Sequence, residues 1–234
     1  MKALIFAAGL GERMRPLTDH TPKPLIEAGG KSLIVWHLEK LAAMGVQDVV
    51  INTSWLADRF PVVLGDGARW GLRIQYLYEG DTPLETGGGM LNALARLGEA
   101  PFLLVNGDIW TDFDFNRLPR EPQGLAHLVM IDPPGYATHG DFALDPAGHV
   151  RGDGERRLTY AGIGVYRPAL LDGWAQHVDD HASIAGNGKP RFRLAPILRA
   201  HMPAGRIHGE HHAGRWTDVG TPERLADLNR ELSR

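Results

Sequence analysis

The sequence has 234 residues, of which 43% are hydrophobic and 23% are charged, and its formal net charge is −3. This near-neutral balance argues against a nucleic acid polymer or an anionic membrane surface as the main partner. Cysteine is absent from the sequence, which excludes disulfides, thiolate metal sites and a cysteine nucleophile. No apolar run approaches the ~20 residues that a membrane-spanning helix needs, so we expect a cytoplasmic protein.

Strand-like and helix-like patterns alternate through the first half of the chain. Apolar runs predict buried strands over residues 3–7, 48–52, 72–78 and 101–108. Helical spacing covers 31–45 and 86–98, and Ser54 suits the N-cap of a short helix limited by Pro61. This order predicts right-handed crossovers and a doubly wound, mostly parallel α/β sheet. Ligands of such sheets lie at the carboxyl ends of the strands.

The pattern is looser after residue 110. Further strands, a hairpin and helices are expected over 125–131, 141–150, 158–166, 192–202 and 221–232. The hairpin should turn at Asp145–Gly148, and Thr221 suits the N-cap of the last helix, with Pro222 at its first position. The polar segment 179–191 predicts a mobile surface loop. Without an internal repeat or a separating linker, we expect a single domain over residues 1–234.

A glycine-containing, cationic loop follows the first strand directly. Its start, GLGERM, fails as a dinucleotide fingerprint, because Met14 stands where a small residue must let helix and strand close up. Pro16 also prevents a helix from following at once. The run GGKS (29–32) fails as a nucleotide-binding P-loop, because Leu25 stands where that motif requires glycine.

The remaining interpretation of this loop is a polyphosphate site. Gly9 and Gly11 allow backbone N–H groups to converge on phosphate oxygens without interference from a Cβ atom. Arg15 can direct two donors at one phosphate, and Lys23 adds a point charge. The alternative is a glycine turn with solvated basic residues. The sequence favours anion binding, because three cations lie in a strand-end loop with little helix.

These residues carry a resemblance to a known family. The run AAGLGERMRPLT…PKPL is similar to the signature of sugar-phosphate nucleotidyltransferases, and further matches follow at PLETGGG (83–89), LLVNGD (103–108) and WTDVGTPERL (216–225). The set most resembles the N-acetylmuramate α-1-phosphate uridylyltransferases, although mannose-1-phosphate guanylyltransferases and glucose-1-phosphate nucleotidyltransferases share much of it. The resemblance implies a Rossmann-like fold and transfer of a uridylyl group from UTP to a sugar 1-phosphate, with release of pyrophosphate.

The resemblance also implies roles for individual residues. Residues 1–110 would form the nucleotide-binding half and residues 111–234 a smaller, mixed α+β sugar-binding part. Asp108 and Asp218 fall at the metal positions and would bind Mg²⁺. Arg15, Lys23 and Asp108 would act in catalysis. The expected nucleotide contacts are Gly9, Gly11, Glu12, Arg13, Lys23, Glu79, Thr86, Gly87 and Gly88.

Three successive glycines, 87–89, open the second long helix although each costs ~1 kcal/mol there relative to alanine. Close packing would explain them, and so would a flat base lying on the backbone. We favour the base, because three glycines exceed what packing alone would need, and because the resembled family contacts the base with this segment.

On the sugar side, the resemblance points to Asn106, Gly140, Asp141 and Glu155. Many guanylyl- and thymidylyltransferases carry a Glu-x-Lys pair that binds the sugar phosphate, where this chain has Arg156 and Arg157 after the glutamate, so the sugar-phosphate contact departs from the family pattern. An N-acetylmuramate substrate would also need a cation for its lactyl carboxylate. Of five candidates, we choose Arg193, since it opens a helix whose N–H groups favour an anion. The other candidates are Lys189, Arg191, Arg206 and Arg215.

Two other classes of protein compete with this interpretation. A catalytically silent, nucleotide-sensing regulatory subunit of the same fold has no need for the two aspartates together with Arg15 and Lys23. A dinucleotide-dependent oxidoreductase is disfavoured by the failed fingerprint. The histidine-rich run 208–212 is expected to be an exposed strand and not a metal site, because His208 and His211 would face opposite ways. Protein partners are not indicated, and a monomer is possible.

Overall fold

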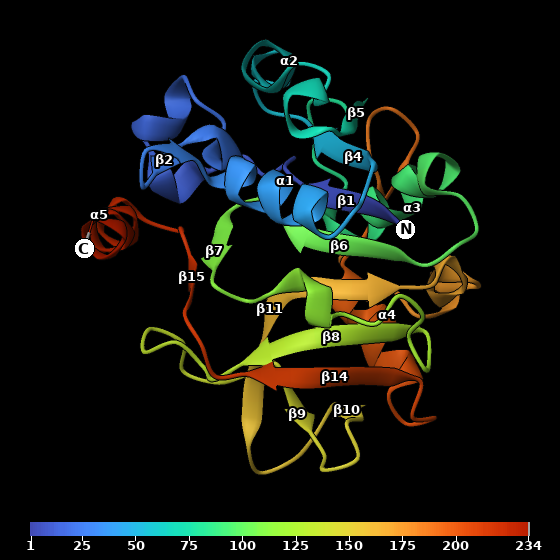
Figure 1. Cartoon of the computed structure of the whole chain (residues 1–234). Coiled ribbons are helices and arrows are strands. Elements are labelled where there is room, and N and C mark those ends of the chain that lie inside the picture. The colour runs from blue at the N-terminus through green and yellow to red at the C-terminus, as the bar shows by residue number, and fades with distance from the viewer. Residues whose placement is uncertain (234) are drawn as a thin grey trace.

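The computed structural model describes residues 1–233, which fold around a nine-stranded sheet with helices on both faces (Figure 1). The central strands are parallel and lie in the order β6-β1-β4-β5. Their bounds are Lys2–Phe6 for β1, Asp48–Thr53 for β4, Arg73–Tyr78 for β5 and Phe102–Asn106 for β6. The doubly wound sheet predicted from the sequence is therefore confirmed.

β1 is the middle strand, parallel to both of its neighbours. Its last residue, Phe6, is level with Asn52 of β4 and Asn106 of β6. The chain crosses from β1 to β4 on one side and later reaches β6 on the other. The carboxyl end of β1 is therefore the switch point of the sheet, where diverging loops leave room for a ligand. The segments that follow β1 and β6 meet there.

The second half of the chain extends the sheet. β11 is antiparallel to β6 and to β8, and β14 runs parallel to β8. β9 and β10 form the hairpin predicted over 141–150, and they attach to the start of β11. The bounds of these strands are Ala126–Ile131 (β8), Phe142–Leu144 (β9), Val150–Arg151 (β10), Arg157–Tyr166 (β11) and Ile207–His212 (β14).

The predicted helices 31–45, 86–98, 192–202 and 221–232 are confirmed. They are α1 (Leu33–Ala43), α3 (Glu85–Leu97), α4 (Leu194–His201) and α5 (Pro222–Leu232). Thr221 caps α5 as expected, by accepting a hydrogen bond from the Arg224 N–H. In the described part of the chain, no helix has both the length and the apolar character needed to cross a bilayer.

Two local predictions require correction. Ser54 does not cap the short helix α2 (Arg59–Leu64); its hydroxyl donates to the Gly80 carbonyl at 2.6 Å. The segment 179–191 is not only a loop, because it contains the hairpin of β12 and β13. Strands this short show no periodic pattern in the sequence. The short strands are Glu27–Ala28 (β2), Lys31–Ser32 (β3), Ile109–Thr111 (β7), Ser183–Ile184 (β12), Pro190–Arg191 (β13) and Trp216–Asp218 (β15).

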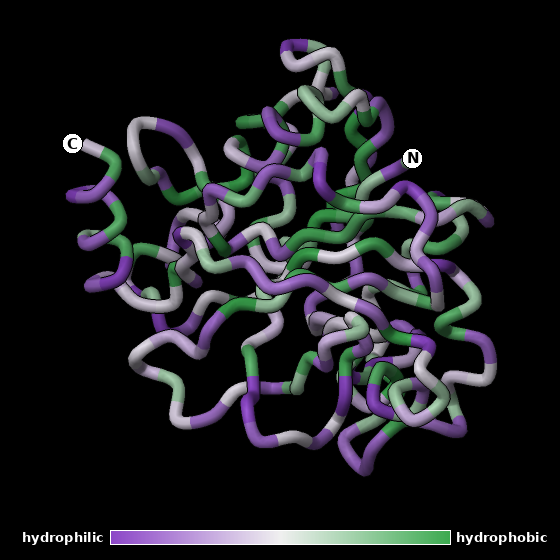
Figure 2. Tube along the Cα trace, turned by 60° about the horizontal axis from the view of Figure 1, so that its bottom comes forward, coloured by the Kyte–Doolittle hydropathy of each residue, from purple (hydrophilic) through white to green (hydrophobic). Residues whose placement is uncertain are grey.

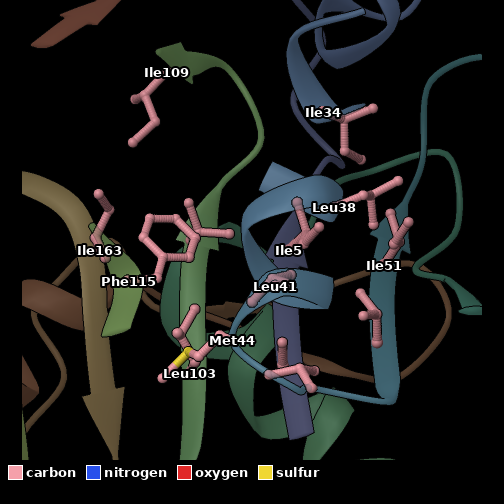
Figure 3. Close-up of a cluster of buried hydrophobic side chains, with 14 of the residues drawn as sticks. Ile5, Ile34, Leu38, Leu41, Met44, Ile51, Leu103, Ile109, Phe115 and Ile163 are labelled. Carbon is pink, nitrogen blue, oxygen red and sulfur yellow. The ribbon is translucent and has the colours of Figure 1, made fainter. Parts of the chain in front are cut away.

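The core around the central sheet has two layers, one on each face, and a third buried cluster lies beneath α5. Alternate residues of each central strand point to opposite faces, so Ile5 and Ile51 pack under α1, while Leu4 packs on the side of α3 and α4. Figure 3 shows Leu38 and Leu41 of α1 beside the strand residues of the first layer. The hydrophobic segments follow the central strands, and the hydrophilic segments lie mainly in the outer loops (Figure 2).

A buried histidine joins α1 to the segment after β6. His37 is 1% exposed, its Nε2 atom lies 2.9 Å from the Ile109 carbonyl oxygen, and its ring stacks on Phe115. Its Nδ1 atom has no hydrogen-bond partner among the described residues. Burial therefore disfavours the charged ring and lowers the pKa of His37 from 6.5 to about 4.

We expect acid to destabilise the protein through His37. Its folded pKa lies below its unfolded value, so the unfolded chain takes up a proton first as the pH falls from about 6.5 to about 4. The free energy of unfolding therefore includes the full contribution of His37 above pH 6.5. It falls by roughly 3 kcal/mol as the pH decreases through that window. The free energy of unfolding, measured with urea at several pH values, should depend less steeply on pH in His37→Gln than in the wild type. Equal slopes would contradict this role.

Candidate active site

A cleft of about 690 Å³ lies at the switch point of the sheet. One wall is the loop after β1, residues 7–14, and the opposite wall is the turn 81–86 that leads into α3. The ends of the strands supply Asn52, Glu79, Asn106 and Asp108, and β13 adds Arg191. The cleft thus lies where the strand order directs the loops apart.

Two glycines of the predicted phosphate loop line this cleft, but they serve it differently. Gly11 has φ +68, and a Cβ atom there would lie 2.8 Å from Cγ2 of Thr18. The Thr18 hydroxyl also donates to the Gly11 carbonyl at 2.8 Å, which fixes the bend of the loop. Gly9 has no atom within 4 Å of such a Cβ. Gly11 is therefore required by the loop's own packing, whereas the space beside Gly9 is open.

The structure separates the three loop cations. Arg13 and Lys23 line the cleft, and the Lys23 ammonium contacts the Asp108 carboxylate at 2.6 Å. Arg15 is not among the lining residues; it is 56% exposed and pairs with Asp19, with 3.4 Å between Nε and Oδ1. Arg15, which the sequence favoured for phosphate contact, therefore lies outside the cleft. Arg13 occupies the position in the cleft that was expected for Arg15.

The two aspartates predicted to bind metal come together through a short pair of strands. β7 starts directly after Asp108, and β15 ends at Asp218, which lies opposite Ile109. The Val219 N–H donates to the Asp108 carbonyl at 2.9 Å. Asp218 lies close to the edge of the cleft, because a Cβ atom added to the lining residue Gly220 would lie 3.0 Å from Oδ2 of Asp218.

Both carboxylates already have cationic partners. Nη1 of Arg224 lies 2.7 and 2.8 Å from the two Asp218 oxygens. The Tyr136 hydroxyl donates to the same carboxylate, and the Arg224 guanidinium stacks on the Tyr136 ring, 3.3 Å from its centre. Neither Tyr136 nor Arg224 was singled out in the sequence, because Tyr136 is distant from Asp218 along the chain and the motif around Arg224 did not indicate where its side chain points.

The donor set fits a magnesium ion. Among the described residues no group of three or more His, Cys, Asp or Glu side chains converges on one point, so a closed site made of protein ligands alone is not present there. Mg²⁺ needs only one or two carboxylates, because phosphate and water fill its octahedral shell. Asp108 and Asp218 offer such a pair of hard oxygen donors beside the cleft.

The glycine run at the start of α3 is explained by packing. Added Cβ atoms would lie 2.4 Å from the Phe192 ring at Gly87, 2.4 Å from the Pro190 carbonyl oxygen at Gly88, and 2.8 Å from Glu79 Oε1 at Gly89. The N–H groups of Gly87 and Gly88 both donate to the Phe192 carbonyl. Neither glycine lines the cleft. Their positions therefore favour the packing explanation over contact with a base.

Other residues of the same turn do reach the cleft. Thr86 lines it, and its hydroxyl oxygen accepts a hydrogen bond from the Leu194 N–H at 2.9 Å. Glu85 precedes it with φ +63, a rare conformation for a residue other than glycine. Glu12 lines the opposite wall. Glu79 is fully buried at the bottom of the cleft, and burial raises the pKa of its carboxyl group above the ordinary value.

The predicted sugar contacts are not gathered in one place. Asn106 lines the cleft and packs against Gly162, whose added Cβ would lie 2.4 Å from the amide nitrogen of Asn106. Gly140, Asp141 and Glu155 are not among the lining residues. Asp141 instead accepts a hydrogen bond from the Tyr160 N–H, and the Gly140 carbonyl accepts one from Arg157.

Arg193 does not line the cleft either. It is the exposed N-cap residue of α4. Of the five cations considered in the sequence, Arg191 is the one among the lining residues. Its guanidinium donates to Glu85 Oε1 at 2.6 Å and to the Pro83 carbonyl at 3.1 Å. The alternation of side chains along an extended segment explains why Arg191 faces the cleft and Phe192 faces the core.

We expect Gly88→Ala to destabilise the protein. The added methyl would meet a backbone oxygen that cannot move without shifting β13, and such overpacking costs ~1–3 kcal/mol. Gly186→Ala is the matched control, because no atom lies within 4 Å of its added Cβ. Urea unfolding measures both. Equal stability of the two variants would contradict the packing explanation and restore the base-contact hypothesis.

Comparison with known proteins identifies the family. Residues 2–141 match the family described as Nucleotidyl transferase. The chain is 44% identical to the N-acetylmuramate alpha-1-phosphate uridylyltransferase of Neisseria meningitidis serogroup B, over 97% of this chain and 96% of that protein. It is 34% identical to the enzyme of that name from Caulobacter vibrioides, over 94% and 92%.

A solved structure agrees in fold. A Bacillus anthracis protein assigned as a glucose-1-phosphate thymidylyltransferase superimposes with a TM-score of 0.84, covering 99% of this chain and 95% of that one, at 19% identity. Together with the strand-end cleft and the paired aspartates, these findings show that the chain belongs to the nucleotidyl transferase family of sugar-phosphate nucleotidyltransferases.

Proposed function

We propose that the protein transfers a uridylyl group from UTP to N-acetylmuramate α-1-phosphate and releases pyrophosphate. The observation that carries the proposal is the convergence of Arg13, Lys23 and Asp108 in one cleft at the switch point. The substrate assignment is supported by the names of the two relatives, which align over nearly the whole chain. The cytoplasmic location and the monomeric state expected from the sequence stay predictions.

The chemistry needs positioning and charge neutralisation more than acid–base catalysis. An anionic oxygen of the sugar 1-phosphate attacks the α-phosphorus of UTP, a new P–O bond forms, and the bond to the departing pyrophosphate breaks. Negative charge on the phosphate oxygens is stabilised by fixed donors that need no rearrangement during the reaction. Arg13 and Lys23, on the loop after β1 and in the segment that follows it, are those donors in our proposal.

Asp108 and Asp218 would hold Mg²⁺. The ion would supply positive charge that offsets the triphosphate and orients its oxygens. The ion pairs with Lys23 and Arg224 hold the two carboxylates at the cleft edge. Lys23 is 8% exposed, so its ammonium group has few partners other than Asp108 and a ligand in the cleft.

The substrates would occupy opposite ends of the cleft. The triphosphate would lie along Gly9, Gly11 and Glu12, and the base would lie beside Thr86 above Glu79. The sugar would reach Asn106, with Gly140, Asp141 and Glu155 as the more distant expected contacts. Arg191 replaces Arg193 as our candidate for the lactyl carboxylate, because it lines the cleft.

The assay that tests this function is pyrophosphate release from a panel of substrates with Mg²⁺ present. We expect the highest kcat/KM with UTP and N-acetylmuramate 1-phosphate. N-acetylglucosamine 1-phosphate lacks the lactyl carboxylate and should be used roughly ten- to hundredfold less efficiently, the usual effect of one charged hydrogen bond. Preference for mannose 1-phosphate with GTP, or no turnover of any pair, would overturn the assignment.

Arg13→Ala and Arg15→Ala form a matched pair of variants. We expect Arg13→Ala to lower kcat by ~10³-fold, because a charge-stabilising arginine in phosphoryl transfer has an effect of that order. Arg15→Ala should leave kcat within about threefold, since its side chain pairs with Asp19 outside the cleft. Thermal unfolding checks that both variants fold. If Arg15→Ala lost activity and Arg13→Ala kept it, the assignment would revert to Arg15.

A further inference from the structure

A chain of three hydrogen bonds crosses the bottom of the cleft. The Ala7 N–H donates to Asn52 Oδ1 at 2.8 Å, and Asn52 Nδ2 donates to Glu79 Oε1 at 2.7 Å. The other oxygen of Glu79 accepts the Leu84 N–H at 2.9 Å. These bonds connect the ends of β1, β4 and β5 with the turn before α3. They are side-chain bonds between strands and are not part of the sheet ladder.

Both side chains are buried where polar groups are costly. Asn52 is 3% exposed and Glu79 is 0% exposed. No Lys, Arg or His side chain of the described residues forms an ion pair with Glu79, so its hydrogen bonds are the main compensation for its burial, and the charge of Lys189 acts on it only from a longer distance. An apolar pair would avoid this desolvation, but it would leave the N–H groups of Ala7 and Leu84 without acceptors. A fully satisfied buried network of this kind fixes geometry more than it adds stability.

The network joins the two walls of the cleft. Ala7 is the first residue of the loop that would hold phosphate, and Leu84 directly precedes Glu85 and Thr86 on the base side. Gly89 of α3 leaves space for the same network, because a Cβ atom added there would lie 2.9 Å from Asn52 Nδ2. Displacement of either side chain would therefore change the distance between the walls. A nucleoside triphosphate has to span that distance.

We propose that Asn52 and Glu79 are positioning residues that set the spacing between the phosphate loop and the base-side turn, and so determine nucleotide affinity. Asn52 acts through Ala7 and Glu79, and it has no part in the chemical step. The inference rests on the proposed function, because it requires a nucleotide in the cleft. It concerns nucleotide binding and leaves open which sugar phosphate is used.

The network allows a reciprocal exchange of its two side chains. In the double variant Asn52→Asp/Glu79→Gln, the new aspartate accepts from Ala7 and from the glutamine amide, and the glutamine oxygen accepts from Leu84. All three hydrogen bonds are kept, with the middle one reversed in direction, and the net charge is unchanged. Asn52→Asp alone places its carboxylate against that of Glu79. Glu79→Gln alone places its amide N–H group against another donor, either Asn52 Nδ2 or the Leu84 N–H. Each single variant therefore loses one of the three hydrogen bonds.

Calorimetric titration with UTP and steady-state kinetics test the proposal. We expect each single variant to raise the Kd and KM for UTP about tenfold or more, the effect of an unpaired buried group. The KM for the sugar phosphate should stay within about twofold, which a general loss of structure would not preserve. The double variant should recover UTP affinity to within about threefold of the wild type. Glu99→Gln, on an exposed residue, controls for the loss of one negative charge.

All variants are compared at a temperature where circular dichroism shows them folded; if Asn52→Asp does not fold, Glu79→Gln and the double variant carry the comparison. Unchanged UTP affinity in the single variants, or a double variant no better than the worse single, would overturn the proposal. A wild type that binds no UTP would overturn it together with the proposed function. UTP binding that follows the expected pattern without turnover would support the positioning role and reject the activity.

Discussion

The site depends on the position of β1 between two parallel neighbours. Ala3, Leu4 and Ile5 are completely buried, so both faces of this strand contribute to the two core layers. Such burial fixes the register of β1, because a shift by one residue would exchange the two faces. The register in turn places the loop after Phe6 against the end of β6. The end of β6, two residues before Asp108, is therefore positioned by the packing of a strand that contains neither Lys23 nor Asp108.

Polar contacts convert this framework into a defined cleft. The loop after β1 bends at Gly11, where only glycine avoids Thr18, and the opposite turn is attached to the segment 190–194 by backbone hydrogen bonds to Phe192. The Asn52–Glu79 network then connects the two walls from below. The last two contacts join segments that are well separated in the sequence. The cleft is thus held open by a few directional bonds on top of a large apolar core, as expected where geometry matters more than stability.

The sequence was sufficient for the elements with strong periodicity. The parallel strands and the helices α1, α3 and α5 follow from apolar spacing, because each buries a continuous face. The two-residue strands β12 and β13 could not be predicted, since they are too short to show a periodic pattern and since β13 packs against the distant turn 83–88. The packing of the glycines 87–89 was equally hidden in the sequence, because the atoms that exclude a side chain belong to residues about a hundred positions later, or to Glu79 beneath them.

The direction of the side chains in the loop after β1 was the second feature that the sequence could not predict. Arg13 lies in a 3-10 turn, and Arg15 is extended before Pro16, as residues preceding proline tend to be. The composition of the loop predicted an anion site, which stays a prediction, but it could not indicate which of Arg13 and Arg15, two positions apart, faces the cleft. Asp108 and Asp218 stand out in their motifs, whereas nothing in the sequence indicated that Arg224 and Tyr136 are the partners of Asp218.

The charge of the cleft supports a role for a divalent cation. Five carboxylates line it, against three cationic side chains: Glu12, Glu79, Asp81, Glu85 and Asp108, with Arg13, Lys23 and Arg191. Two of those cations are already paired with carboxylates of the same cleft. Arg13 alone cannot offset a triphosphate and a sugar phosphate, whose negative charges repel each other. A divalent cation held by Asp108 and Asp218 would offset part of this negative charge where the two phosphates meet, which is why we propose metal binding for the two aspartates and direct contact with phosphate for Arg13.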